Sequence, residues 1–428
     1  MNHPAFVRRV LALVLTAAVA VAAALPGFAV YAMPIQTAYP QESIYLFDAN
    51  TGEALVEQNP DMVRHVASLT KMMTALLVIE NGSDLNASIT IPDSLTPEFQ
   101  SIKANRGHTI GLQAGESVRR IDLLYAMLLP SANDAASVLA SDAAGGDLAA
   151  FAARMNARAS QLGCTTTHFS CPHGLYDANN YSTARDLAKI ALACYANPTY
   201  RQVADTVLYQ LPATNVHETR TITTTNKLLQ PGSAAYRSYA HGMKTGFTTK
   251  AGRCFVTFAQ QDGHTYGLVI LGSDLDNIYK EASELLDWAF ASFADRRLVD
   301  TTTPLTTVPL TKCRSAEAVE LYAAEPVSGY GHADDKVTYS FALPERVSAT
   351  VKADAVLGQA TVYLDGYEVG TVDLVTHQEY VSDFRTDLKS TLLLMAALVL
   401  LLAVLSCVTL VSGGSSLNRN RRRRANRK

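Results

Sequence analysis

The chain of 428 residues is longer than one typical domain, so its length favours two domains plus targeting segments. Its formal net charge of −3 hides an uneven distribution, because seven basic residues lie between Arg419 and Lys428. Without these seven and the Arg8-Arg9 pair, 27 basic residues face 39 acidic ones, a balance of about −12. Such an acidic remainder excludes a general attraction to nucleic acids and other polyanions.

Residues 1–32 predict a signal peptide. Arg8-Arg9 forms a basic start, residues 10–24 are apolar, and Val30-Tyr31-Ala32 offers a cleavage site of mostly small residues. An uncleaved N-terminal anchor is the alternative, although Pro26-Gly27 interrupts the apolar run. We therefore expect an exported protein that begins near residue 33.

A hairpin and a helix are expected next. Ile44–Val56 alternates around a turn at Asn50-Thr51-Gly52, which predicts two paired strands. Ser68-Leu69-Thr70-Lys71 then leads into Met72–Ile79, an apolar run without a polar face, which indicates a helix buried on all sides. Ser68 would lie in its first turn with Lys71 on the same face, near backbone N–H groups that can stabilise an oxyanion. Taken alone, the Ser-x-x-Lys motif is equally compatible with a helix-capping serine and a solvated lysine.

The segment Ser131-Ala132-Asn133 lies between two helical stretches. Residues 121–129 form an apolar run that Pro130 ends, and a second helical stretch starts at Asp134. A tight junction of this kind can hold short polar side chains rigidly. An ordinary helix cap is the alternative for the tripeptide alone.

Lys244-Thr245-Gly246 precedes a predicted hairpin. Residues 253–259 and 266–271 are β-like runs joined by an Asp262-Gly263 turn. The motif would lie on the preceding strand, where Gly246 allows a substrate backbone to approach closely. Together the three motifs supply a hydroxyl nucleophile with a nearby lysine, a second hydroxyl beside an amide, and a cation next to a hydroxyl. This set is suited to acyl transfer through a serine ester, with lysine handling the protons.

The C-terminal third of the chain has a different character. A helix is expected from about Asn277 to Phe293, and after it short alternating segments separated by turns predict a small all-β domain at residues 301–383. Residues 391–411 are uncharged and long enough to cross a membrane, and the basic tail 412–428 follows them. By the positive-inside rule, this tail is cytoplasmic and the catalytic region lies outside.

The six cysteines form no clear framework. Cys407 falls in the predicted span, which leaves an odd number outside, although Cys164 and Cys171 are close enough in sequence to pair. A metal site is not supported, because His168 and His173 lack a recognisable ligand pattern. We expect no cofactor.

With the three motifs in this order, the sequence resembles the low-molecular-mass penicillin-binding proteins of the D-alanyl-D-alanine carboxypeptidase type (S11 serine peptidases). The resemblance runs from about Ser43 to about Val381. The segments that carry it are Ala67–Ala75, Gly115-Glu116, Leu129–Ala135, Phe169–Leu175, Tyr181–Leu187, Asn226–Leu229, Gly242–Thr248 and Ala251–Cys254.

The resemblance implies an α/β fold of the serine β-lactamase/transpeptidase type over residues 33–300, followed by the β domain as a stalk. The α/β domain of this type consists of an antiparallel sheet with helices on both faces and a helical lobe beside the sheet. The implied catalytic residues are Ser68 as nucleophile, Lys71 as base, Ser131 as proton relay and Asn133 as an orienting group. The implied substrate-binding residues are Lys244, Thr245, Gly246 and Phe247. Lys244 would lower the pKa of Lys71, and the backbone N–H groups of Ser68 and Phe247 would form the oxyanion hole.

Two departures from the family pattern narrow the prediction. The second motif is Ser-Ala-Asn where β-lactamases usually have Ser-Asp-Asn, and no deacylating glutamate can be assigned, which argues against antibiotic hydrolysis. Tyr279 lies near the position of an arginine that often meets the substrate carboxylate. Carboxylate binding is therefore expected to fall on Lys244 and Thr245.

We thus expect a membrane-anchored serine-type D-Ala-D-Ala carboxypeptidase that acts on peptidoglycan stem peptides and is inhibited by β-lactams. Its expected location is the cell membrane, with a single pass and the catalytic domain on the extracellular face. DD-endopeptidase or transpeptidase activity on the same substrates is an alternative. A β-lactamase and a non-catalytic wall-binding protein are further alternatives.

Overall fold

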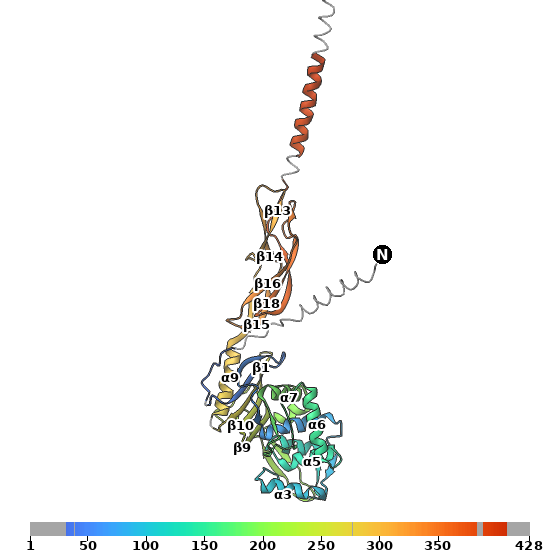
Figure 1. The fold of residues 1–428 in the computed structure, drawn as a ribbon, viewed down its shortest axis with the longest axis vertical. Helices are drawn as coiled ribbons and strands as arrows, with labels where there is room; N and C mark the ends of the chain where they lie inside the picture. Colours follow the sequence, from blue (N-terminus) through green and yellow to red (C-terminus); the bar gives the residue numbers. More distant parts are fainter. Residues whose placement is uncertain (1–30, 38, 276, 383–387, 409–428) are drawn as a thin grey trace, which may run out of the picture. The chain divides into compact units, whose positions relative to one another are not determined.

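A computed structural model describes residues 31–37, 39–275, 277–382 and 388–408 (Figure 1). The predicted signal peptide, except its last two residues, and the basic tail lie outside the described residues. The chain packs as two units that divide after Ala294. Each unit is considered by itself below.

The first unit is built on a five-stranded antiparallel sheet in the order β2-β1-β11-β10-β9. Its strands are β1 (Ser43–Asp48), β2 (Ala54–Gln58), β9 (Ala240–Thr248), β10 (Gly252–Gln261) and β11 (His264–Ser273). Both predicted hairpins are confirmed, since β1 pairs with β2 and β10 pairs with β11 around Asp262-Gly263. The strands thus come from the two ends of the unit, and a largely helical segment separates them.

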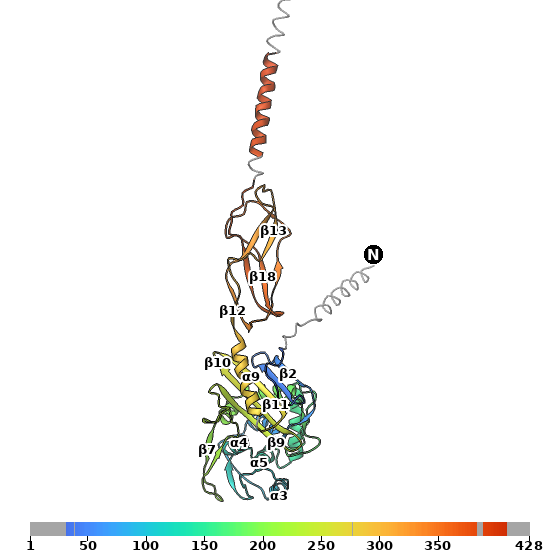
Figure 2. The ribbon, with the colours of Figure 1, turned by 90° about the vertical axis from the view of Figure 1, so that its left-hand side faces the viewer.

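Helices and short strand pairs make up the rest of the unit (Figure 2). The helices are α2 (Thr70–Glu80), α3 (Thr96–Ala104), α4 (Arg120–Leu128), α5 (Asn133–Ala143), α6 (Leu148–Gln161), α7 (Ala184–Ala196), α8 (Pro198–Ala204) and α9 (Ile278–Ser292). The short pairs are β3 (Arg64–His65) with β6 (Tyr181–Ser182), β4 (Ser88–Thr90) with β5 (Ser117–Arg119), and β7 (Leu208–Leu211) with β8 (Arg220–Thr223).

Helices cover both faces of the sheet. Tyr266 on β11 contacts Phe290 of α9, with ring centroids 4.9 Å apart, whereas Phe258 on β10 stacks on Tyr195 of α7 at 4.1 Å. Phe258 is in register with Gly267, the residue after Tyr266. Successive residues on a strand point to opposite faces, so α7 and α9 lie on opposite sides. The predicted layered fold with a helical lobe is confirmed.

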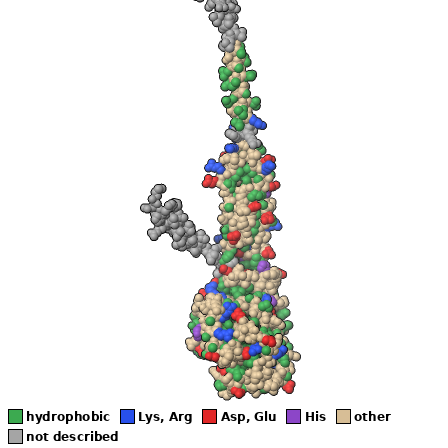
Figure 3. Space-filling view, turned by 90° about the vertical axis from the view of Figure 1, so that its right-hand side faces the viewer, with side chains coloured by type: hydrophobic (Ala, Val, Ile, Leu, Met, Phe, Trp, Pro, Cys, Tyr) green, Lys and Arg blue, Asp and Glu red, His purple; other side chains and the backbone are tan. Residues whose placement is uncertain are grey.

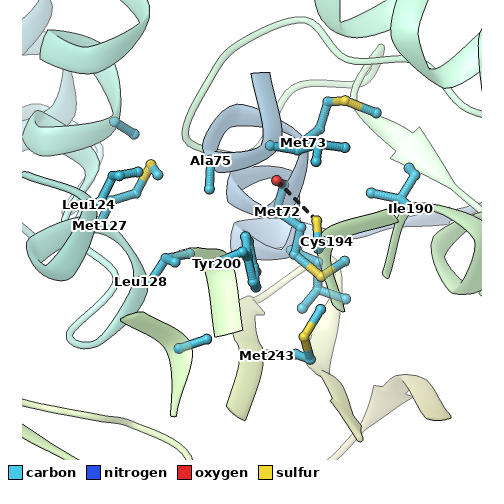
Figure 4. Packing of buried hydrophobic residues seen from close by; sticks show 14 of the residues in the cluster. Met72, Met73, Ala75, Leu124, Met127, Leu128, Ile190, Cys194, Tyr200 and Met243 are labelled. Atoms are coloured by element: carbon cyan, nitrogen blue, oxygen red, sulfur yellow. Dashed lines mark hydrogen bonds between the residues drawn. The ribbon is translucent and has the colours of Figure 1, made fainter. Parts of the chain in front are cut away.

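Helix α2 is the centre of the helical lobe. Its residues from Thr70 to Val78 are all buried, as its uniformly apolar sequence predicts. Figure 4 shows Met72, Met73 and Ala75 of α2 enclosed by side chains from α4, α7, α8 and β9. This buried helix rigidly supports the turn Ala67–Leu69 that precedes it.

Apart from the helix Leu388–Val408, the described residues of the second unit form an all-β domain, as predicted. Its main sheet has the order β16-β18-β19-β14-β13-β17, and β12 pairs with β15. The strands are β12 (Phe293–Val299), β13 (Thr306–Thr311), β14 (Ala318–Ala323), β15 (Val327–His332), β16 (Val337–Ala342), β17 (Val347–Ser348), β18 (Val356–Leu364) and β19 (Tyr367–Val375). Alternate residues such as Val319 and Leu321, or Ala360 and Val362, point into one apolar core.

One helix in the described residues, Leu388–Val408, is long and apolar enough to cross a membrane. Its hydrophobic side chains are exposed along its length (Figure 3). It begins three residues before the predicted span, whose last three residues lie outside the described part. The helix suggests membrane anchoring.

Candidate active site

Ser68 lies in a tight turn of 3₁₀ helix, Ala67–Leu69, immediately before α2. Ala67 has φ +47°, an uncommon conformation for a residue with a side chain. This bend ends β3 and places Ser68 one tight turn ahead of α2 rather than within its first α-helical turn. Lys71, in the first turn of α2, still reaches the Ser68 hydroxyl, with Nζ and Oγ 3.0 Å apart.

The Lys71 amine is completely buried and lies among three polar partners. Besides Ser68 Oγ, these are Asn133 Oδ1 and the backbone oxygen of His173, each 2.6 Å from Nζ. Both carbonyl oxygens can only accept hydrogen bonds, so they take two N–H groups of the lysine. When the amine is neutral, its lone pair is then left to accept the Ser68 O–H.

The surroundings of Lys71 favour this neutral form. Burial is the main cause that lowers the pKa of Lys71 well below its usual value, and the positive charge of Lys244 is the second. The sequence indicated only the second cause. Burial also lowers the pKa of Lys244 itself, to about 7.

Ser131 and Asn133 lie at the junction of α4 and α5, as predicted. Ser131 has φ +70°, a strained conformation for a serine, and its buried Oγ has no hydrogen-bond partner among the described residues. A hydroxyl held in this way is available to a ligand. Asn133 is the first residue of α5, and its backbone N–H donates to His108 O at 2.8 Å.

Strand β9 brings the third motif alongside Ser68. A Cβ on Gly246 would lie 3.1 Å from Ser68 N and 3.2 Å from Val66 O, so glycine allows the nucleophile turn itself to approach the strand. Lys244 is buried and donates to Thr245 O at 2.8 Å. The Thr245 hydroxyl lies 2.5 Å from that of Thr225, and Phe247 is 53% exposed.

A cleft of about 490 Å³ joins these groups. Six of the eight predicted site residues line it: Ser68, Ser131, Asn133, Thr245, Gly246 and Phe247. The two lysines, Lys71 and Lys244, are buried behind its wall. The structure therefore brings together hydroxyl and amide groups at the surface and amines with lowered pKa beneath them.

The segment around His173 packs against the turn that carries Ser68 and against the start of α2. Thr74 Oγ1 donates to Pro172 O at 2.6 Å, and Asn180 Nδ2 donates to Thr70 Oγ1 at 2.9 Å. Gly174 has φ +80° and lies so close to the turn that a Cβ would come within 2.0 Å of Ala67 O. The contact of the His173 backbone oxygen with Lys71 was not predicted, because a backbone acceptor leaves no residue-type signal. Only the Pro-His-Gly-Leu resemblance pointed to this segment.

The structure also bears on the predictions about the cysteines and a metal site. Cys164 and Cys171 are free thiols in the structure, as are the other cysteines, so the considered pairing is not formed. Within the described residues no group of three or more His, Cys, Asp or Glu side chains could hold a metal ion. His173 Nε2 instead lies 3.1 Å from Glu98 Oε1.

Tyr279, at the start of α9, lines the cleft. Its hydroxyl donates to Thr225 O at 2.9 Å, and its ring packs against Phe255. The hydroxyl thus braces the loop that carries Thr225.

The fold and the site are those of a serine acyl-transfer enzyme, with a buried lysine beside the serine where a histidine base is more familiar. A family model described as D-alanyl-D-alanine carboxypeptidase matches residues 32–275, more than half of the chain. A second model, for the C-terminal domain of penicillin-binding protein 5, matches residues 297–382. The chain belongs to the D-alanyl-D-alanine carboxypeptidase family and is a serine hydrolase.

Individual relatives agree with this assignment. A D-alanyl-D-alanine carboxypeptidase from Streptomyces sp. (strain K15) is 33% identical over 258 residues, which span 58% of this chain and 86% of the relative. A D-alanyl-D-alanine endopeptidase from Pseudomonas aeruginosa is 33% identical over 257 residues, 60% of this chain and 78% of the relative. The crystal structure of the Streptomyces K15 DD-transpeptidase is similar with a TM-score of 0.54 and 32% identity, and covers 60% of this chain and 100% of that one.

Proposed function

We propose that the protein removes the terminal D-alanine of peptidoglycan stem pentapeptides through an ester on Ser68. One observation carries the proposal. The two carbonyl acceptors at 2.6 Å use the N–H groups of a neutral Lys71 and leave its lone pair for Ser68 Oγ at 3.0 Å, at the wall of an open cleft.

Acylation begins when Ser68 Oγ attacks the carbonyl carbon between the two terminal D-alanines. Its proton passes to Lys71, whose lowered pKa favours the neutral amine that can accept it. The backbone N–H groups of Ser68 and Phe247 stabilise the oxyanion. Gly246 lets the strand bearing Phe247 lie close enough to Ser68 for one oxygen to meet both groups.

Breakdown of this intermediate needs a proton on the leaving nitrogen. Ser131, whose buried hydroxyl has no partner among the described residues, relays the proton from Lys71 to that nitrogen. The C–N bond breaks, D-alanine departs, and the shortened peptide remains as an ester on Ser68. Water then attacks the ester and gives its proton to Lys71, which returns it to Ser68 as the C–O bond breaks. No cofactor enters these steps.

A β-lactam would acylate Ser68 in the same way, and this is the first test. We expect fluorescent penicillin to label the purified protein, the Ser68→Ala variant to remain unlabelled, and the wild-type label to persist. Rapid release of the label would indicate a β-lactamase. Failure to label a folded wild-type protein would favour a non-catalytic wall-binding role and reject the proposal.

Endopeptidase activity is a second candidate, and one feature favours it. A neighbouring cavity of about 880 Å³ shares Lys227, Gln230, Leu275 and Tyr279 with the catalytic cleft. Such room would accommodate a leaving group larger than one D-alanine. Digestion of cross-linked and uncross-linked muropeptides separates the two activities, since a carboxypeptidase releases D-alanine and leaves the cross-links intact.

We further propose that the helix Leu388–Val408 anchors the protein in the cell membrane with the catalytic unit outside. The basic residues that follow it in sequence support a cytoplasmic C-terminus. Protease added to intact protoplasts should remove the catalytic unit and spare an epitope tag at the C-terminus. Protection of the catalytic unit would reject this orientation.

A further inference from the structure

The catalytic cleft is positively charged, although the predicted exported part of the chain is acidic. Its lining includes Arg106, Lys227 and Arg253 and no aspartate or glutamate among the described residues. None of these three side chains forms an ion pair within the described part of the chain. Unneutralised cations at a cleft raise the local concentration of an anionic ligand.

The strand register shows which residues share a face of the sheet with Arg253. Arg253 lies opposite Phe247 in the register of β10 and β9, and Thr245 is two residues from Phe247 on the same strand. Residues two apart on a strand, and those paired across strands, share a face of the sheet. The side chains of Thr245, Phe247 and Arg253 therefore line the cleft from one face.

The guanidinium group is also held in position. Its central carbon lies 4.3 Å from the centroid of the Phe247 ring, a cation–π contact that fixes the long side chain. The charge of Arg253 acts to lower the pKa of Tyr279, against burial, which raises it, so the two side chains are close. Tyr279 itself carries no charge here, and its hydroxyl is bound to Thr225 O.

Lys244 is less suited to meet a substrate carboxylate than the sequence indicated. Its side chain is buried, its Nζ donates to Thr245 O, and it does not line the cleft. A pKa of about 7 also leaves it only partly charged at neutral pH. Among the residues that line the cleft with Thr245 and Tyr279, Arg253 supplies a guanidinium group that keeps its charge at neutral pH.

We propose that Arg253 binds the carboxylate of the substrate's terminal D-alanine, with the Thr245 hydroxyl beside it. This inference rests on the proposed function and names the residue that recognises the free chain end. A guanidinium fork matches the two oxygens of a carboxylate, and no ion pair among the described residues has to be broken. Arg253 thereby makes the enzyme select a peptide with a free C-terminus.

The test compares an N-acylated peptide ending in D-Ala-D-Ala with the same peptide carrying a C-terminal amide. In Arg253→Gln, we expect kcat/KM for the free acid to fall about 10- to 100-fold, the range of a charge-assisted pair, and for the amide to change less than about threefold. Arg253→Lys should recover part of the loss, because it keeps the charge without the fork.

Two controls separate this role from others. Arg201→Gln removes a guanidinium that lies over the Tyr195 ring at 5.1 Å outside the cleft, and it should leave both substrates unaffected. Arg106→Gln removes another cleft cation and should lower kcat/KM for the free acid clearly less than Arg253→Gln does.

Equal losses for acid and amide in Arg253→Gln would overturn the inference, as would a wild type that does not prefer the acid. A loss in Arg106→Gln as large as that in Arg253→Gln would also overturn it, in favour of a general charge effect. Penicillin labelling of Ser68 reports separately on the proposed function. If the wild type is neither labelled by penicillin nor active on either peptide, the proposed function itself is rejected.

Discussion

The two units of the protein differ in what they bury. The β unit packs a core that is almost wholly apolar, with Val308, Leu321 and Leu374 among its buried residues. The catalytic unit buries Lys71 and Lys244 as well, together with polar groups such as Asn133. Removing an amine from water is costly unless it is hydrogen-bonded or neutral.

This difference shows where the chain gives up stability for chemistry. In the catalytic unit the cost of burial lowers the pKa of both lysines, and the lowered pKa of Lys71 is what a base for Ser68 requires. The β unit contains no comparable constellation in its described residues, and its alternating strands need only fill a core. Three experiments test this contrast, from the largest expected effect to the smallest.

Replacing Lys71 by methionine should produce the largest effect. The side chain keeps its approximate shape but loses the lone pair that faces Ser68, so the rate of penicillin acylation should fall by about 10²–10⁴-fold. Circular dichroism should show that the protein remains folded. Lys280 is an exposed lysine on α9, and Lys280→Met is the matched control. Penicillin should acylate this variant at the wild-type rate. Wild-type labelling of Lys71→Met would contradict the assignment of the base.

A pair of core truncations compares the stability of the units. Leu124→Ala removes a fully buried side chain behind α2, and Leu374→Ala removes one in the β unit. Each should lower the free energy of unfolding of its own unit by about 2–5 kcal/mol, measured by calorimetry. Leu374→Ala should leave penicillin labelling unchanged at 25 °C. A single transition that moves equally in both variants would show that the units unfold together.

The pH dependence of stability should differ more subtly. The pKa of Lys244 is about 7 when folded and 10.5 when unfolded, so between these values the unfolded chain binds more protons. The stability of the catalytic unit should therefore rise with pH above about 7. The pKa of Glu42 is raised to about 7, so this carboxyl makes stability fall as the pH rises, but only below about pH 7. Melting curves from pH 7 to 8.5 should show a smaller slope in Lys244→Met, and an unchanged slope would contradict the assigned shift.

Much of the fold could be predicted because its signals are local. The uniformly apolar run after Lys71 predicted a buried helix, Pro130 marked a helix end, and Asp262-Gly263 marked a hairpin. Each signal depends on residues within a few positions of one another. These local signals predicted the order of strands and helices along the chain. The resemblance to a family predicted how they pack in space.

Long-range contacts were harder to predict. The sequence predicts carboxylate binding by Lys244 and Thr245; in the structure Thr245 and Arg253 line the cleft, and Lys244 is buried. Which of several cations on adjacent strands faces a ligand depends on register and on packing against neighbours such as Phe247. Neither is visible in a motif.

The sequence by itself determined the chemical groups: a serine with a lysine three residues on, a second serine with an asparagine, and a lysine beside a threonine. Only the tertiary structure decided how these groups act. Lys71 lies beside Ser68 in a buried site, where Asn133, 62 residues away, and the backbone of His173, 102 residues away, accept hydrogen bonds from its amine. Burial and the nearby charge of Lys244 lower the pKa of this amine, and both arise only when distant segments pack together.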